Sequence, residues 1–246
     1  MDKPTFKLTQ RCTFYLLFLV FCLLPSASCL MSYVFCLLFL VCSVLLTTFI
    51  DAVPVKADHV KLLQSALIPL HKVKSMQMYH AHLVYCMAQY IEKEQRFAIP
   101  IIGGILKFYP YGNTGKELLF LEELCELIEV LSPATLAEVE VQVYQRLALC
   151  IEGDHFQIAE KALHFWGNEI LNQTVMEMQS HRAVVLPIIF NALYKNSDPE
   201  TAHWQGSIRD GAMFVLQRYE STDPDLYQQC VAKYEEDQPY KRLAKK

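Results

Sequence analysis

Histidines are the residues of this chain best suited to acid–base or metal chemistry, and two short stretches hold four of the eight. In YHAHLVYC (79–86), His80 precedes His82 by two residues, and in HFQIAEKALHFWGNE (155–169), His155 precedes His164 by nine. On a helix, residues two apart point to different faces, and residues nine apart are separated by about 13 Å along the axis. Neither pair suits one metal ion, so the sequence predicts core or surface histidines.

Glutamates are concentrated in one expected helix, residues 115–131. Glu122, Glu126 and Glu129 share a face at spacings of four and three, and Glu123 lies off that face. Paired catalytic carboxylates need different environments and a cleft between them, which one helix face does not provide. The pattern is typical of a solvated face, and docking of a basic partner is the functional alternative.

Cysteine spacing and glycine motifs give no sign of catalysis. Nine cysteines are present without a Cys-x-x-Cys pair or zinc spacing, which favours reduced, buried thiols. The stretch IIGGILK lacks the spacing of a phosphate-binding loop, and no Gly-x-Ser-x-Gly sequence occurs. The sequence therefore predicts no catalytic, cofactor-binding or metal site.

Helical periodicity dominates from residue 51 onward, and no convincing strand alternation is present. The expected helices are 58–73, 79–94, 98–109, 115–131, 136–151, 155–176, 181–195, 201–219 and 223–236. Breakers between them supply capping residues, among them Ser132, Asp154 and Asp223. The connections between the expected helices are short, so consecutive helices are predicted to be antiparallel neighbours.

A recurring Ile/Leu-Pro step marks an internal repeat. It occurs at Pro69, Pro100 and Pro187, and Gln142 holds the corresponding place in the helix between the last two. Most of these intervals match the period of about 40–47 residues of two-helix HEAT-type repeats. Such repeats bury their apolar stripes only against neighbours. We therefore expect an all-α, HEAT-like helical-repeat solenoid.

The stretch 155–169 is expected to be a wall of this array. Its apolar residues recur at steps of three and four, whereas Gln157, Glu160, Lys161 and His164 fall mostly on the other side. The expected buried stripe consists of Phe156, Ile158, Ala159, Ala162, Leu163, Phe165 and Trp166.

The first 50 residues differ from the remainder. A basic start and an apolar run precede PSASC, which resembles a signal-peptide cleavage region, and residues 31–50 carry no charge. Twenty such residues suffice for a membrane span. A buried helix at the end of the array, or an artefact of gene prediction or rearrangement, are the alternatives. We expect an apolar segment 1–50, a repeat domain 51–237 and a short basic tail 238–246.

The formal net charge is −4, and the excess of acid lies after residue 50. Nucleic acid is therefore not expected as a partner, because phosphate neutralisation needs clustered Lys and Arg.

Long stretches from about Val53 to Asp237 closely resemble the B-prime (B56-type) regulatory subunits of protein phosphatase 2A. The resemblance is carried by LIPLHKVKSM, YHAHLVYCMAQYIEKE, IIGGILKFYP, KELLFLEELCELIEVL, HFQIAEKALHFWGNE and LPIIFNALY followed by HW. It covers the second half of a family member. It implies a non-catalytic subunit that binds the phosphatase scaffold and catalytic subunits and selects phosphoprotein substrates in the cytoplasm or nucleus.

The resemblance also implies a site for short Leu-x-x-Ile-x-Glu peptides. VPVKADH (53–59) resembles the family's sequence at the end of that groove, so Lys56 and His59 are carried over as peptide contacts. Thr47 stands where the family has an apolar contact, and the earlier repeats are expected to be missing. We therefore expect weak peptide binding. The alternative function is a membrane-tethered or truncated helical adaptor that no longer assembles with the phosphatase.

Overall fold

The computed structural model describes residues 55, 57–169, 173–198, 201 and 203–237. The chain divides into two compact units, 1–53 and 54–246, and all described residues belong to the second. Several sequence predictions fall outside the described residues: the apolar run 31–50, Thr47, Lys56 and the basic tail 238–246.

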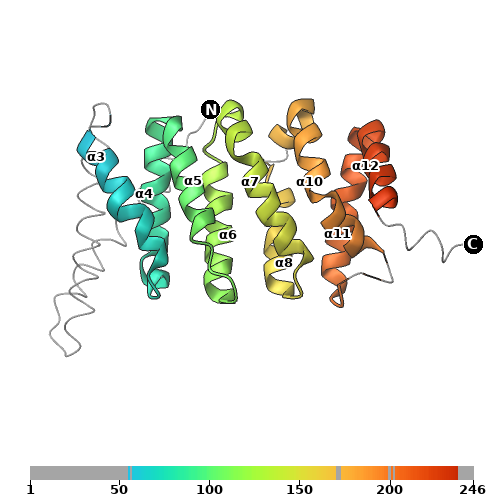
Figure 1. The fold of residues 1–246 in the computed structure, drawn as a ribbon, viewed down its shortest axis with the longest axis horizontal. Helices are drawn as coiled ribbons and strands as arrows, with labels where there is room; N and C mark the ends of the chain where they lie inside the picture. The colour runs from blue at the N-terminus through green and yellow to red at the C-terminus, as the bar shows by residue number, and fades with distance from the viewer. Residues whose placement is uncertain (1–54, 56, 170–172, 199–200, 202, 238–246) are drawn as a thin grey trace, which may run out of the picture. The chain divides into compact units, whose positions relative to one another are not determined.

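All regular elements among the described residues are helical, and no strand occurs there (Figure 1). The α-helices are α3 (Ala57–Leu62), α4 (His80–Lys93), α5 (Ala98–Lys107), α6 (Thr114–Ile128), α7 (Pro133–Glu152), α8 (Phe156–Leu163), α10 (Gln179–Ser197), α11 (Gly206–Thr222) and α12 (Pro224–Asp237). Shorter 3₁₀ or π segments are η1 (Leu63–Leu67), η2 (Ile68–Lys72), η3 (Met76–Met78), η4 (Gln95–Phe97), η5 (His164–Gly167) and η6 (Gln173–Glu177). The expected all-α class is confirmed.

The helices from α4 onward form two packed layers, as a HEAT-like array requires. In one layer α5 packs on α7, α7 on α10, and α10 on α12; in the other α4 packs on α6, α6 on α8, and α8 on α11. Contacts between α7 and α8 and between α10 and α11 join the layers. Each helix therefore buries its apolar stripe against neighbours, which is how repeat proteins gain stability.

The prolines of the repeat step all lie in helical segments, and one of them coincides with a change of helix type. Pro69 is in the opening turn of η2, at the end of a continuous helical path through α3 and η1. Proline lacks the N–H that an α-helix needs, so the path changes from π to 3₁₀ hydrogen bonding there. Pro100 lies in the first turns of α5, and Pro187 lies inside α10.

The expected single helix 155–176 is wrong. Helix α8 ends at Leu163, and the chain continues as the 3₁₀ helix η5 as far as Gly167. Asn168 is then extended, with ψ 120°. Glycine and asparagine are poor helix formers, so the break falls where the sequence offers them. Glu169 is helical again, and the described chain continues in η6 after residues 170–172.

The expected helix 201–219 also begins later, at Gly206. Side-chain contacts hold the preceding segment out of the helix. The backbone N–H of His203 donates to Asn196 Oδ1 at 3.1 Å, and His203 Nε2 lies 3.0 Å from the carbonyl oxygen of Asp154.

Two of the three expected capping residues are confirmed. Ser132 Oγ accepts from the backbone N–H of Thr135 at 3.3 Å, and Asp223 Oδ1 accepts from that of Leu226 at 3.2 Å. Asp154 is not a cap, because α8 starts one residue later, with His155 at its N-cap position and no side-chain capping bond.

Gly104 allows the closest helix approach in the first repeats. A Cβ atom added there would overlap Ile68 Cγ2, whereas a Cβ on the neighbouring Gly103 would meet nothing within 4 Å. The absence of a side chain at position 104 therefore sets how closely α5 packs on η2.

Candidate functional site

Glu123 is a fully buried carboxylate that contacts two histidines. His71 Nε2 lies 2.9 Å from Oε1, and His80 Nε2 lies 3.2 Å from Oε2. The other ring nitrogen of His71 lies 2.7 Å from the carbonyl oxygen of Ile68. Because both ring nitrogens of His71 face acceptors, the geometry suits the doubly protonated cation. This cluster joins η2, α4 and α6.

The opposite charges of His71 and Glu123 shift the pKa of each side chain toward its charged form. Burial acts to lower the pKa of His71, but the hydrogen bond and charge of Glu123, with the Ile68 carbonyl, raise it above 6.5. Burial likewise acts to raise the pKa of Glu123, but the hydrogen bonds and charges of His71 and His80 hold it below 4.5. The result is a buried ion pair that lines neither of the two hollows described below, which favours a structural role.

Two further buried polar contacts join α10 to α7. His181 Nδ1 bonds Glu140 Oε2, and Asn196 Nδ2 donates to the carbonyl oxygen of Ile151 at 3.0 Å. Buried polar groups that are paired in this way fix the register between helices.

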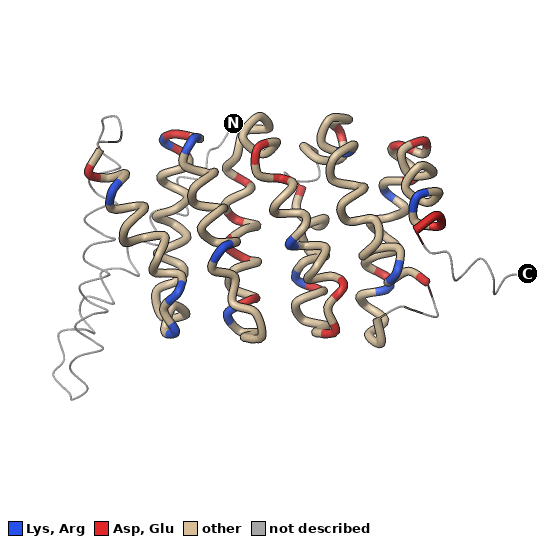
Figure 2. Tube along the Cα trace, viewed as in Figure 1, with Lys and Arg blue, Asp and Glu red and all other residues tan. Residues whose placement is uncertain are grey.

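The acidic face of α6 is solvated, as the sequence predicted. Glu122, Glu126 and Glu129 are exposed, and Figure 2 shows acidic residues recurring along α6. Together with Lys161 and Asn168 they line a hollow of about 210 Å³ beside α8. Lys161 Nζ lies 3.5 Å from Glu122 Oε1, so the acidic charge is only partly offset.

The other candidate histidines are not brought together. His155 and His164 are both exposed at opposite ends of α8, and His82 takes no part in the Glu123 cluster. Across the described residues, no group of three or more His, Cys, Asp or Glu is placed to hold a metal ion. The described thiols Cys86, Cys150 and Cys230 are buried, as expected, and Cys125 is half-buried.

His59 is the only one of the two expected peptide contacts that lies among the described residues. It is half-buried in α3, and its carbonyl oxygen accepts a hydrogen bond of 3.0 Å from the hydroxyl of Tyr90. Peptide binding by Lys56 and His59 stays a prediction.

The wall expected of residues 155–169 is confirmed around Trp166. Its side chain is 4% exposed, its ring centroid lies 5.9 Å from that of Tyr144, and Nε1 donates to Tyr219 Oη at 3.5 Å. Of the expected stripe, Phe156 is half-buried and the other members are buried.

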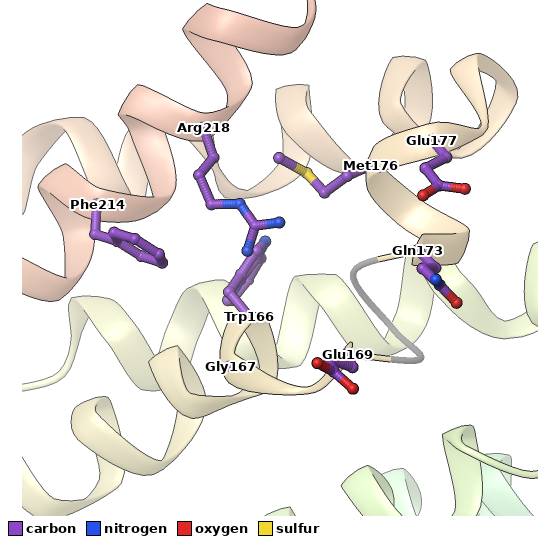
Figure 3. A pocket seen from close by; sticks show the side chains of 8 residues that line it. All are labelled: Trp166, Gly167, Glu169, Gln173, Met176, Glu177, Phe214 and Arg218. Atoms are coloured by element: carbon purple, nitrogen blue, oxygen red, sulfur yellow. The ribbon is translucent and has the colours of Figure 1, made fainter.

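A second hollow, of about 370 Å³, lies where η5, η6 and α11 meet (Figure 3). Trp166, Met176 and Phe214 form its apolar surface. The polar residues that line it are Glu169, Gln173, Glu177 and Arg218. The two hollows share Gly167, which lines both. Sequence reasoning missed this hollow because it depends on the break after Gly167.

No described helix is both long and apolar enough to cross a membrane. The run 31–50 lies outside the residues to which this finding applies.

A stack of antiparallel helix pairs with solvated hollows and buried structural ion pairs defines the class: a helical-repeat binding protein. A sequence model described as "Protein phosphatase 2A regulatory B subunit (B56 family)" matches residues 29–246. The chain belongs to this family.

Curated relatives agree with this assignment. The chain is 38% identical over 187 residues to the eta isoform of the 59 kDa B' regulatory subunit of Arabidopsis thaliana, covering 76% of this chain and 36% of that protein. It is 37% identical over 195 residues to the delta isoform of the 56 kDa regulatory subunit of Homo sapiens, covering 79% and 31%. The chain therefore spans about a third of the length of these relatives.

Proposed function

We propose that this chain acts as a non-catalytic regulatory subunit of protein phosphatase 2A, binding the scaffold and catalytic subunits and modulating which phosphoproteins are dephosphorylated. The observation that carries the proposal is the family match over residues 29–246, on a helical array of the expected kind. The cytoplasm or nucleus is the corresponding place of action.

The matched range begins before the apolar run 31–50 and includes it. The membrane-tethered adaptor gains no support from the comparisons.

Large exposed side chains on the connections between paired helices support a protein-binding role. Tyr111, between α5 and α6, is 70% exposed, and Trp204, between α10 and α11, is 72% exposed. Exposed aromatic residues of this kind are common anchors of protein interfaces.

Both rings are held in place before any partner binds. The Tyr111 ring lies 5.4 Å from that of Tyr109 and 4.7 Å from the Arg146 guanidinium, and the Trp204 ring lies 5.7 Å from that of Phe156. Rings that are already ordered lose little conformational entropy on binding, which favours affinity.

Regulation is tested by adding the purified full chain to the scaffold–catalytic dimer and measuring dephosphorylation rates for a panel of phosphopeptides. We expect the relative rates to change as the chain is added. Trp204→Ala or Tyr111→Ala should raise the chain concentration that gives half of this change by at least about fivefold, the effect of losing one anchor. Val141→Ala, at an apolar site within α7 that is 40% exposed, serves as the control. Rates that stay unchanged at saturating chain would refute the proposal.

A further inference from the structure

The hollow between η5, η6 and α11 combines an apolar surface with charged side chains that form no ion pair among the described residues. Trp166 and Met176 are buried, whereas Phe214 is 53% exposed at the rim. Figure 3 shows Phe214 and Arg218 on α11 at one side, and Glu169, Gln173 and Glu177 at the other. The hollow therefore has apolar side chains with one arginine at one side and two carboxylates at the other.

The carboxylates at the acidic end are not neutralised within the described part of the chain. Among the ion pairs of the described residues, none includes Glu169, Glu177 or Arg218. The Arg218 guanidinium instead lies 5.7 Å from the centre of the Phe214 ring, on the apolar side. Two exposed carboxylates that form no ion pair among the described residues leave this end negative.

We propose that this hollow binds an extended segment of a partner protein that carries a large apolar side chain and, two residues away, an arginine or lysine. In an extended segment, residues i and i+2 point to the same side about 7 Å apart. The apolar side chain packs against Phe214 and Trp166, and the basic one reaches Glu169 and Glu177. An aromatic anchor beside a charge is the composition typical of interface hot spots.

The occupant is identified by charge complementarity. An acidic side chain would meet two carboxylates, whereas a basic one satisfies them. The chain's own tail, YKRLAKK (240–246), has similar chemistry and is the competing occupant that a test must distinguish. Binding at this hollow is tested on the isolated full chain, without the phosphatase. Its failure is therefore distinguishable from failure of the proposed regulatory function.

The test is a fluorescence-anisotropy titration of the full chain with dye-labelled peptides in a Gly-Ser background. The probes contain Phe-Ser-Arg or Arg-Ser-Phe, and the comparison peptides contain Phe-Ser-Glu or Ala-Ser-Arg. We expect at least one of the two probes to bind about tenfold tighter than either comparison peptide, a difference typical of one anchor. Binding should weaken with salt, because the charges are exposed.

Variants locate the binding in the hollow. Glu169→Gln with Glu177→Gln, and separately Phe214→Ala, should each weaken probe binding about tenfold. Met213→Ala and Glu220→Gln, exposed sites on α11 that do not line the hollow, should leave it unchanged.

Three outcomes would overturn the proposal. The first is absence of probe binding, and the second is binding of the Phe-Ser-Glu peptide as tightly as the probes. The third is a rise of more than about threefold in probe affinity when Lys241→Ala and Arg242→Ala are made together in the full chain. That rise would show that the basic tail, not a partner protein, occupies the hollow.

Discussion

The pairing of His71 with Glu123 makes the stability of the array depend on pH. The raised pKa of His71 means that its contribution is complete below the unfolded value of 6.5 and is lost as pH rises through the folded pKa. The lowered pKa of Glu123 means that its contribution is complete above 4.5 and is lost as pH falls through the folded pKa. Both contributions are therefore complete between these two values.

Glu123→Gln tests this dependence because it keeps the shape and removes the charge. Denaturant unfolding is measured for both proteins from about pH 5.5 to about pH 8.5, a range that spans the titration of histidine. We expect the wild type's advantage in unfolding free energy to shrink as pH rises above 6.5, as His71 loses its proton. An advantage that grows with pH would show that His71 is not a cation in the folded chain.

Trp166 provides a residue-scale test of the buried wall. Trp166→Ala removes a side chain that is 4% exposed, and we expect it to lower the free energy of unfolding by about 3–5 kcal/mol. Trp204→Ala, at a site 72% exposed, is the matched control and should change it by no more than about 0.5 kcal/mol. Equal effects of the two substitutions in chemical denaturation would contradict the burial assigned to Trp166.

At the scale of elements, the neighbouring glycines of α5 make a paired experiment. Gly104→Ala places a methyl group on Ile68 Cγ2 and should destabilise by about 1–3 kcal/mol, as overpacking does. Gly103→Ala meets open space and should stabilise by about 0.5–1 kcal/mol through helix propensity. Thermal unfolding temperatures should therefore move in opposite directions.

Relief of the overlap provides the control for this pair. Ile68→Ala should cost less in the Gly104→Ala background than in the wild type, because the added methyl group then has room. Simple additivity of the two substitutions would contradict the close approach of α5 to η2.

Most helices could be predicted from the sequence because their signals are local. Ser132 and the following proline mark the start of α7, and apolar residues at steps of three and four mark the buried faces. The break at Gly167 was missed because the apolar period continues past it, and the late start of α11 depends on contacts of Asn196 and His203 across the fold.

The buried ion pair had a weaker signal that could have been recognised. Glu123 lies off the acidic face of α6 and between the apolar residues Phe120 and Leu127, so helical geometry alone places it toward the core. Its partners are 52 and 43 residues away, and no local pattern identifies them.

At the scale of the whole molecule, we expect a chain that spans about a third of its B56-type relatives to be sufficient for binding the phosphatase. Each repeat contacts only its neighbours, so a run of repeats can keep a surface that belongs to a longer array. The family match and the ordered exposed rings of Tyr111 and Trp204 support this expectation.

The most direct test is calorimetric titration of the purified full chain into the dimer of phosphatase 2A scaffold and catalytic subunits. We expect a one-to-one complex that Trp204→Ala weakens and Val141→Ala does not. Absence of heat and of co-elution at concentrations up to tens of micromolar, with a chain that unfolds cooperatively, would contradict a regulatory role in the phosphatase.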